Sequence, residues 1–315
     1  MIDFRYHLVS LIAVFLAVAL GIIIGTTALN EPILADIEGQ VADLEQDKRS
    51  LEDRTQQLQA QLDTTQAFEE AVAPALVDGT LADRSVLLVV TNEDVAPETV
   101  DAVTALIGEA GGSVSGQLTL QPEYTDPSTE AALQGYVTGG GLPSGVQLPE
   151  ADDTGQLVGA LLAQVLMLQP EGTAPDPTAI SSVLAGLSAL DVLSQDSDAV
   201  APADYAVVLT SGAFAGEDAA ERSGTLVDLV TALDAAGSGA VVAGDAGSAA
   251  ESGLVGTLRA DPTVSAAVST VDNVNAVAGQ ISTVLALGQE GEGTSGKYGT
   301  GEDTQPVPPV PTTTP

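Results

Sequence analysis

The chain has 315 residues, with 44 acidic and 8 basic side chains and a formal net charge of -36. This balance excludes nucleic acid as a partner, because phosphate binding needs clustered Lys and Arg, and it excludes electrostatic docking on anionic lipid. The chain has no cysteine and one histidine, which excludes disulfides, a thiol nucleophile and a thiolate metal site.

Residues 1–30 predict a short cytoplasmic start and a transmembrane anchor. No charged residue occurs from Leu8 to Asn30, and this run is long enough to cross about 30 Å of hydrocarbon. Arg5 precedes the run and acidic residues follow from Glu31, which predicts a cytoplasmic N-terminus and an extracytoplasmic bulk. The alternative is a cleaved signal peptide, but its apolar core spans only about 7–15 residues. We therefore expect a single-pass protein of the cell membrane.

One face of the predicted anchor carries only small side chains. Its members recur at every fourth position: Ala13, Ala17, Gly21 and Gly25. Such a stripe lets two helix backbones approach closely in lipid. It predicts a packing face between two copies, with chance in an Ala- and Gly-rich chain as the alternative.

Residues 31–73 predict a coiled-coil stalk. Asn30 and Pro32 favour the start of a new helix. Apolar residues then follow heptad spacing: Leu34, Ile37, Val41, Leu44, Leu51, Leu58 and Leu62. Such a helix is unstable alone, so it needs a partner. We expect a parallel homodimer, because the membrane helices would already align two chains; the alternative partner is the surface of the chain's own domain.

Residues 80–287 predict an extracytoplasmic α/β domain. Short runs rich in Val and Leu predict strands at 85–91, 113–120, 204–210, 240–244 and 265–271. Helices are expected at 97–107, 127–136, 153–168, 177–193, 216–236, 247–258 and 274–287. This alternation is typical of a mostly parallel sheet flanked by helices. Residues 288–315 are rich in Gly, Pro and Thr and predict a disordered tail.

The composition excludes the common catalytic sites that depend on histidine or cysteine. The single histidine is His7, so the outer domain has no Ser-His-Asp triad and no histidine metal site. We expect neither a cofactor nor enzymatic activity. Ligands of doubly wound sheets bind outside the carboxyl ends of the strands, where Asp94 and Asp245 are candidates for holding a hard cation. The alternative is that these residues serve as helix caps and turn residues.

The N-terminal segment has a pattern of its own, formed by His7, Val9, Ser10, Leu11, Phe15, Leu16, Ala17, Gly21 and Gly25. This pattern resembles the actinobacterial MctB (mycobacterial copper transport protein B) / SteB-like family. The resemblance implies an envelope protein of copper homeostasis. For SteB-like members it also implies a role in cell separation beside a membrane partner, SteA.

The residues fit a direct copper carrier poorly. Cu(I) prefers Cys and Met, and Cu(II) prefers imidazole, whereas the chain offers His7, Met1 and Met167. We therefore rank a non-enzymatic dimeric scaffold or regulator first. A genuine copper transport component comes second, and an enzyme that uses carboxylates alone comes third.

Overall fold

The computed structural model describes residues 4–310 apart from 141, 144, 152, 170–173 and 198, and it leaves the side chains of 26–36 and 38 undescribed. The chain divides into two compact units, Met1–Thr65 and Gln66–Pro315.

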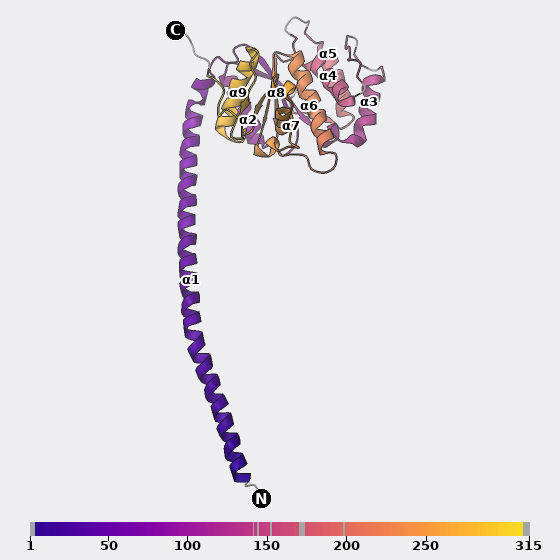
Figure 1. The fold of residues 1–315 in the computed structure, drawn as a ribbon. Helices are drawn as coiled ribbons and strands as arrows, with labels where there is room; N and C mark the ends of the chain where they lie inside the picture. The colour runs from indigo at the N-terminus through magenta and orange to yellow at the C-terminus, as the bar shows by residue number, and fades with distance from the viewer. Residues whose placement is uncertain are drawn as a thin grey trace. The chain divides into compact units, whose positions relative to one another are not determined.

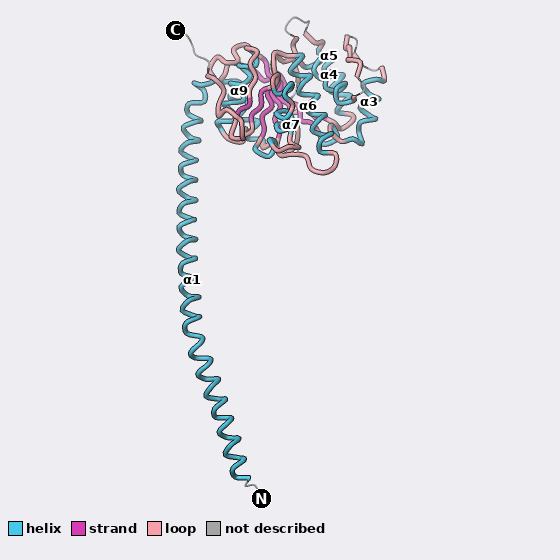
Figure 2. Tube along the Cα trace, viewed as in Figure 1, coloured by secondary structure: helices cyan, strands magenta, loops and turns pink. Residues whose placement is uncertain are grey.

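The first unit is formed by a single helix, α1 (Phe4–Val77), whose last turns belong to the second unit (Figures 1 and 2). Its segment Phe4–Gly25 has a mean hydropathy of 2.9 and is long and apolar enough to cross a membrane. The expected new start at Asn30 and Pro32 is wrong, because α1 continues through both residues. A proline removes one backbone hydrogen bond, and the helical segments on either side maintain the helix.

The expected end of the stalk at residue 73 also falls inside α1. Ala73 and Val77 are 3% and 0% exposed and pack in the core of the second unit. Pro74 lies between them, and its carbonyl accepts a hydrogen bond from the Asp78 amide. Burial of these last turns therefore outweighs the tendency of proline to end a helix.

The heptad positions of α1 are exposed in the single chain. Between 50% and 70% of each described side chain is accessible: Ile37, Val41, Leu44, Leu51, Leu58 and Leu62. The side chain of Leu34 lies outside the described residues. The coiled coil therefore stays a prediction.

The second unit is built on a seven-stranded mixed sheet in the order β3-β2-β1-β4-β5-β6-β7. Its strands are β1 (Ser85–Val90), β2 (Ser113–Leu120), β3 (Leu193–Gln195), β4 (Tyr205–Thr210), β5 (Ala240–Gly244), β6 (Ser269–Val271) and β7 (Lys297–Tyr298). Among the pairings of these described strands, only β2–β3 is antiparallel. Every residue of β4 and β5 is buried, as expected for parallel strands covered on both faces. The predicted α/β class is confirmed.

Helices cover both faces of the sheet. One core contains Leu87, Val208 and Val242 together with residues of α4 (Thr154–Leu166), α5 (Pro177–Ser188), α6 (Ala219–Ala236) and α7 (Leu254–Ala260). The other contains Leu88, Val207 and Val241 with residues of α2 (Pro97–Glu109), α9 (Val277–Gly291) and the end of α1. Alternate strand residues thus point to opposite cores. The remaining helices are α3 (Glu130–Thr138), α8 (Pro262–Ser265) and the 3-10 turns η1 (Pro122–Tyr124), η2 (Pro127–Thr129) and η3 (Ala246–Ala249).

The C-terminal segment differs from its prediction. Disorder from residue 288 is wrong for the described residues 288–305, because α9 continues to Gly291 and β7 pairs with β6. Tyr298 is 2% exposed and bridges to Gln305. Residues 311–315 lie outside the described part. The helix expected at 177–193 likewise ends at Ser188, and β3 follows it.

Candidate functional site

The sheet creates a crevice where its strand order changes direction. Successive strands proceed from β1 to one side through β2 and from β4 to the other side through β5. A cavity of about 460 Å³ lies beyond the carboxyl ends of β1, β2 and β4. We call it the strand-end crevice; among its lining residues are Thr91, Asn92, Glu93, Asp94, Gln121, Ser211, Gly212, Phe214 and Arg222. Doubly wound sheets bind ligands at this position.

The structure separates the two sequence-predicted carboxylates. Asp94 lines the strand-end crevice, whereas Asp245 does not. Asp245 Oδ1 accepts hydrogen bonds from the backbone amides of Gly212 and Ser248, each at 2.9 Å. Its Oδ2 accepts one from Ser211 Oγ at 3.1 Å. Asp245 thus caps η3 and holds the turn after β4, in which Gly212 has a φ of +68°. This is the turn and capping role of aspartate.

Arg222 brings a positive charge to the strand-end crevice, and no sequence pattern predicts this residue as part of the site. Its guanidinium lies 4.6 Å from the ring centroid of Phe214, within the range of a cation–π contact. Its Nε donates a hydrogen bond to Thr125 Oγ1 at 3.1 Å. No local spacing signals this arrangement, because 97 positions separate Thr125 from Arg222.

Two buried polar atoms at the strand-end crevice have no hydrogen-bond partner within the described part of the chain: Thr91 Oγ1 and Asn92 Oδ1. The Asn92 amide group is oriented by its Nδ2, which donates to the Ser211 carbonyl at 2.9 Å. The crevice thus combines oxygen acceptors, the carboxylates of Glu93 and Asp94, and one guanidinium. It suits a polar ligand that both donates and accepts hydrogen bonds.

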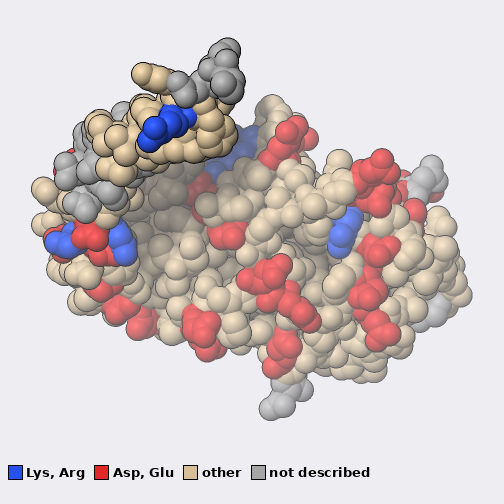
Figure 3. Space-filling view, turned by 90° about the horizontal axis from the view of Figure 1, so that it is seen from below, with Lys and Arg blue, Asp and Glu red and all other residues tan. Residues whose placement is uncertain are grey.

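The described residues hold no group of three or more His, Cys, Asp and Glu arranged for a metal ion. Met167 is 0% exposed and belongs to a hydrophobic core, which removes it as a surface ligand for Cu(I). His7 lies in the apolar segment of α1. Carboxylates dominate the charged side chains on the face drawn in Figure 3, but carboxylates alone give little selectivity for copper.

The small-residue face of the membrane segment is open in the single chain. A Cβ atom added at Gly21 or Gly25 would meet nothing within 4 Å. Ala13 and Ala17 lie on the same helical face, since i and i+4 positions lie above one another. The structure describes one chain, so packing through this face stays a prediction.

The apolar N-terminal helix and the doubly wound domain define an α/β protein suited to membrane anchoring. The chain matches the family model described as "Copper transport outer membrane protein, MctB" over residues 1–309. It therefore belongs to the MctB family, as its N-terminal pattern predicts. The copper transporters MctB of Mycobacterium tuberculosis (strain ATCC 25618 / H37Rv) and Mycobacterium bovis are each 32% identical over 98% of this chain and 99% of their own length. That of Mycobacterium leprae is 31% identical over 96% of this chain and 97% of its own. Family and helix together fit a membrane-anchored protein.

Proposed function

We propose that the chain is a non-enzymatic scaffold or regulator of the cell envelope, acting in copper homeostasis or cell separation. Its N-terminus lies in the cytoplasm, and the α/β domain lies outside. Membership of a copper transport family supports the link to copper. The charge order around Phe4–Gly25 supports the orientation, because a cationic flank stays inside.

The set of possible copper ligands in the chain is the observation that favours this proposal over direct copper transport. The chain has no cysteine, its one histidine is in the apolar helix, and Met167 is buried. A single membrane helix encloses no pore by itself. Copper as a cargo would thus meet mainly carboxylates, and an indirect effect through the envelope fits these residues better.

Dimerisation is part of the same proposal. The heptad side chains of α1, such as Leu44 and Leu51, are 70% and 65% exposed, and a long helix with such a seam needs a second helix. A parallel homodimer joined at the anchor and stalk would cover them. The resemblance to SteB-like proteins adds a SteA-like membrane protein as a proposed partner.

Direct copper transport is the second candidate, because the relatives are named "Copper transporter MctB". A carboxylate-based enzyme is the third. Such an enzyme would need a pair of carboxylates with different pKa values. Asp153 and Asp228 form a candidate pair, because burial and the charge of Asp153 raise the pKa of Asp228 to about 6. Asp153 also caps α4 by accepting a hydrogen bond from the Gln156 amide, which is a structural role.

Copper binding by the full chain in a neutral detergent tests the proposal. We expect weak association of Cu(II) that high salt removes, since screening shortens the reach of exposed charges, and no tight binding of Cu(I). A stoichiometric, salt-resistant copper site would contradict the scaffold proposal. Loss of that site in Asp94→Ala or Asp245→Ala would locate it. Copper sensitivity of a deletion strain, rescued by these same variants, would support an indirect role.

A further inference from the structure

A second cavity, of about 220 Å³, shares Thr125 with the strand-end crevice and lies between the segment around η1 and η2 and the helices α3, α4 and α6. We call it the acidic pocket. Five carboxylates line it, and no Lys or Arg is among its described lining residues: Asp126, Glu130, Asp153, Glu221 and Asp228. Asp228 is half-buried and the other four are exposed. The pocket therefore has an acidic rim and a deeper carboxylate.

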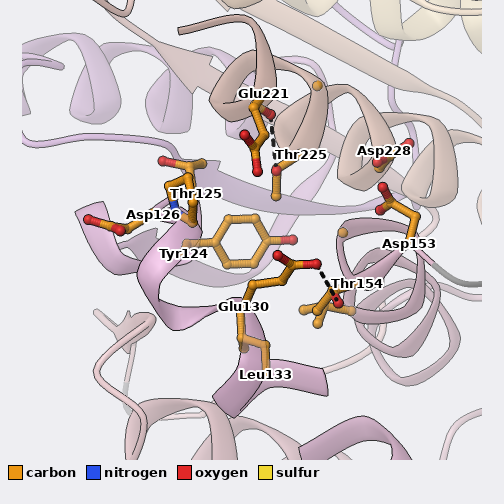
Figure 4. A pocket seen from close by; sticks show the side chains of 14 residues that line it. Tyr124, Thr125, Asp126, Glu130, Leu133, Asp153, Thr154, Glu221, Thr225 and Asp228 are labelled. Atoms are coloured by element: carbon orange, nitrogen blue, oxygen red, sulfur yellow. Dashed lines mark hydrogen bonds between the residues drawn. The ribbon is translucent and has the colours of Figure 1, made fainter. Parts of the chain in front are cut away.

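Tyr124 is the second feature of the acidic pocket. The residue is 2% exposed, and its hydroxyl has no hydrogen-bond partner among the described atoms. Figure 4 shows this hydroxyl directed into the space between Glu130 and Asp153. Burial, together with the charge of Asp228, raises the pKa of Tyr124 above its ordinary value, so the phenol stays neutral. Buried tyrosine hydroxyls normally have a partner; this one has none among the described residues and lies at the wall of the acidic pocket.

The close approach of two carboxylates depends on Gly155. A Cβ atom at this position would lie 3.1 Å from Asp153 Oδ1 and 3.1 Å from Asp228 Oδ2. The two oxygens thus flank the glycine, and the mutual repulsion is part of what raises the pKa of Asp228. A positive group between them would relieve that repulsion. On the opposite side, Glu130 Oε1 is held by Thr154 Oγ1 at 3.4 Å.

The size of the acidic pocket and the spacing of its oxygens favour an organic cation over a metal ion as its ligand. No three carboxylates of the described chain converge closely enough for a metal, and hard cations need six or more oxygens at about 2.0–2.6 Å. The oxygens of the acidic pocket are instead spread around a cavity of about 220 Å³. Ammonium and guanidinium groups carry several N–H donors that reach separated acceptors.

We propose that the acidic pocket binds an organic cation through a primary ammonium or guanidinium group, held by Tyr124, Glu130, Asp153 and Asp228. The cation is either a free small amine or a basic side chain of another protein, since both present the same group. This binding is independent of copper and extends beyond the scaffold role.

Calorimetric titration of the full chain in neutral detergent tests the proposal, with agmatine as the free amine and N-acetyl-arginine amide as the side-chain mimic. We expect one saturable site for at least one of them at moderate salt. Tetramethylammonium, which has the charge but no N–H donor, should not saturate it. Preference for agmatine indicates a free amine, and preference for the arginine mimic indicates a basic side chain of a partner.

Three variants separate this site from general attraction to an acidic surface. Tyr124→Phe leaves the charge unchanged and should weaken binding about tenfold, because it removes one hydrogen bond to a charged group. Asp228→Asn should weaken it at least as much. Asp101→Asn removes the same charge from an exposed position of α2 and should leave the affinity unchanged. The proposal is overturned if binding of neither probe saturates or if Tyr124→Phe binds as tightly as wild type. It is also overturned if Asp101→Asn loses as much affinity as Asp228→Asn.

Discussion

Arg259 Nη1 donates a hydrogen bond to Asp272 Oδ2 at 2.7 Å, and the two side chains are only 13% and 2% exposed. Asp272 also accepts hydrogen bonds from the backbone amides of Thr300 and Gly301, at 2.7 and 3.1 Å. Arg259 Nη2 donates to the Tyr298 carbonyl at 2.9 Å. One buried ion pair thus joins α7 and the end of β6 to the C-terminal segment that contains β7.

Asp272→Ala should therefore release this segment. The change leaves the Arg259 guanidinium buried without its charge partner, which costs about 3 kcal/mol in comparable cases. We expect a lower free energy of unfolding in chemical denaturation and faster amide exchange at Tyr298 and Gly299. The matched control is Glu52→Ala, which breaks the exposed Lys48–Glu52 pair at 3.5 Å and should change little. Unchanged exchange at Tyr298 would contradict the role of the pair.

Glu290 should make the α/β domain more stable at pH 5.5 than at pH 7.5. Burial raises the pKa of Glu290 from 4.5 to about 7, although the Ser269 hydrogen bond opposes the shift and the charge of Asp234 adds to it. Burial likewise raises the pKa of Asp234 to about 6. Between the ordinary and the raised pKa of each group, 3.8 to about 6 for Asp234 and 4.5 to about 7 for Glu290, the native state therefore binds more protons than the unfolded state. Stability falls as pH rises through this window and is level above it.

Glu290→Gln should weaken that pH dependence, and the raised pKa values of Asp234 and Asp228 should preserve the rest. The amide can still accept the hydrogen bond that the Ser269 amide donates at 2.7 Å, but it carries no charge to desolvate. We expect a gain of about 1 kcal/mol at pH 7.5 and a smaller gain at pH 5.5, measured by denaturant unfolding at both pH values. Glu292→Gln, at an exposed position nearby, serves as the control. A pH dependence identical to that of wild type would exclude Glu290 as its source.

The anchor and its orientation are tested by a reporter fused after Pro315. We expect activity only for a reporter that functions outside the cytoplasm, because the cationic flank at Arg5 stays inside. Mass spectrometry of the mature protein should recover the segment Leu8–Leu29. A mature N-terminus after Ala28 would show instead that the apolar helix is a cleaved signal.

The predicted coiled coil is tested by introduced cysteines, since the chain has none of its own. Ile37→Cys and Leu44→Cys lie at d positions of the heptad and should crosslink between two chains in the membrane. Gly39→Cys, on the opposite face at an f position, is the control. The double variant Leu44→Asp, Leu51→Asp should abolish the crosslink at Ile37→Cys, because two charges would enter the seam. Equal crosslinking at Gly39→Cys would refute the register.

Local sequence patterns are sufficient for the anchor and for the main strands. The uncharged run from Leu8 to Asn30 predicts the apolar segment because hydrocarbon accepts no unpaired charge. The runs that form β1, β4 and β5 are predicted because strands of a covered parallel sheet are apolar throughout. These features depend on neighbouring residues, and a single sequence records them.

The short edge strands and the sites depend on partners distant in the chain. Residues 297–298 form β7 only because β6 offers an edge and Arg259 holds the Tyr298 carbonyl. Arg222 reaches Thr125 across 97 positions. The acidic pocket likewise unites Tyr124 with Asp228 from a different element. Composition shows an excess of carboxylates, but only tertiary packing decides which of them are buried, which are caps and which face a common cavity, because burial and charge–charge distance are properties of the folded chain.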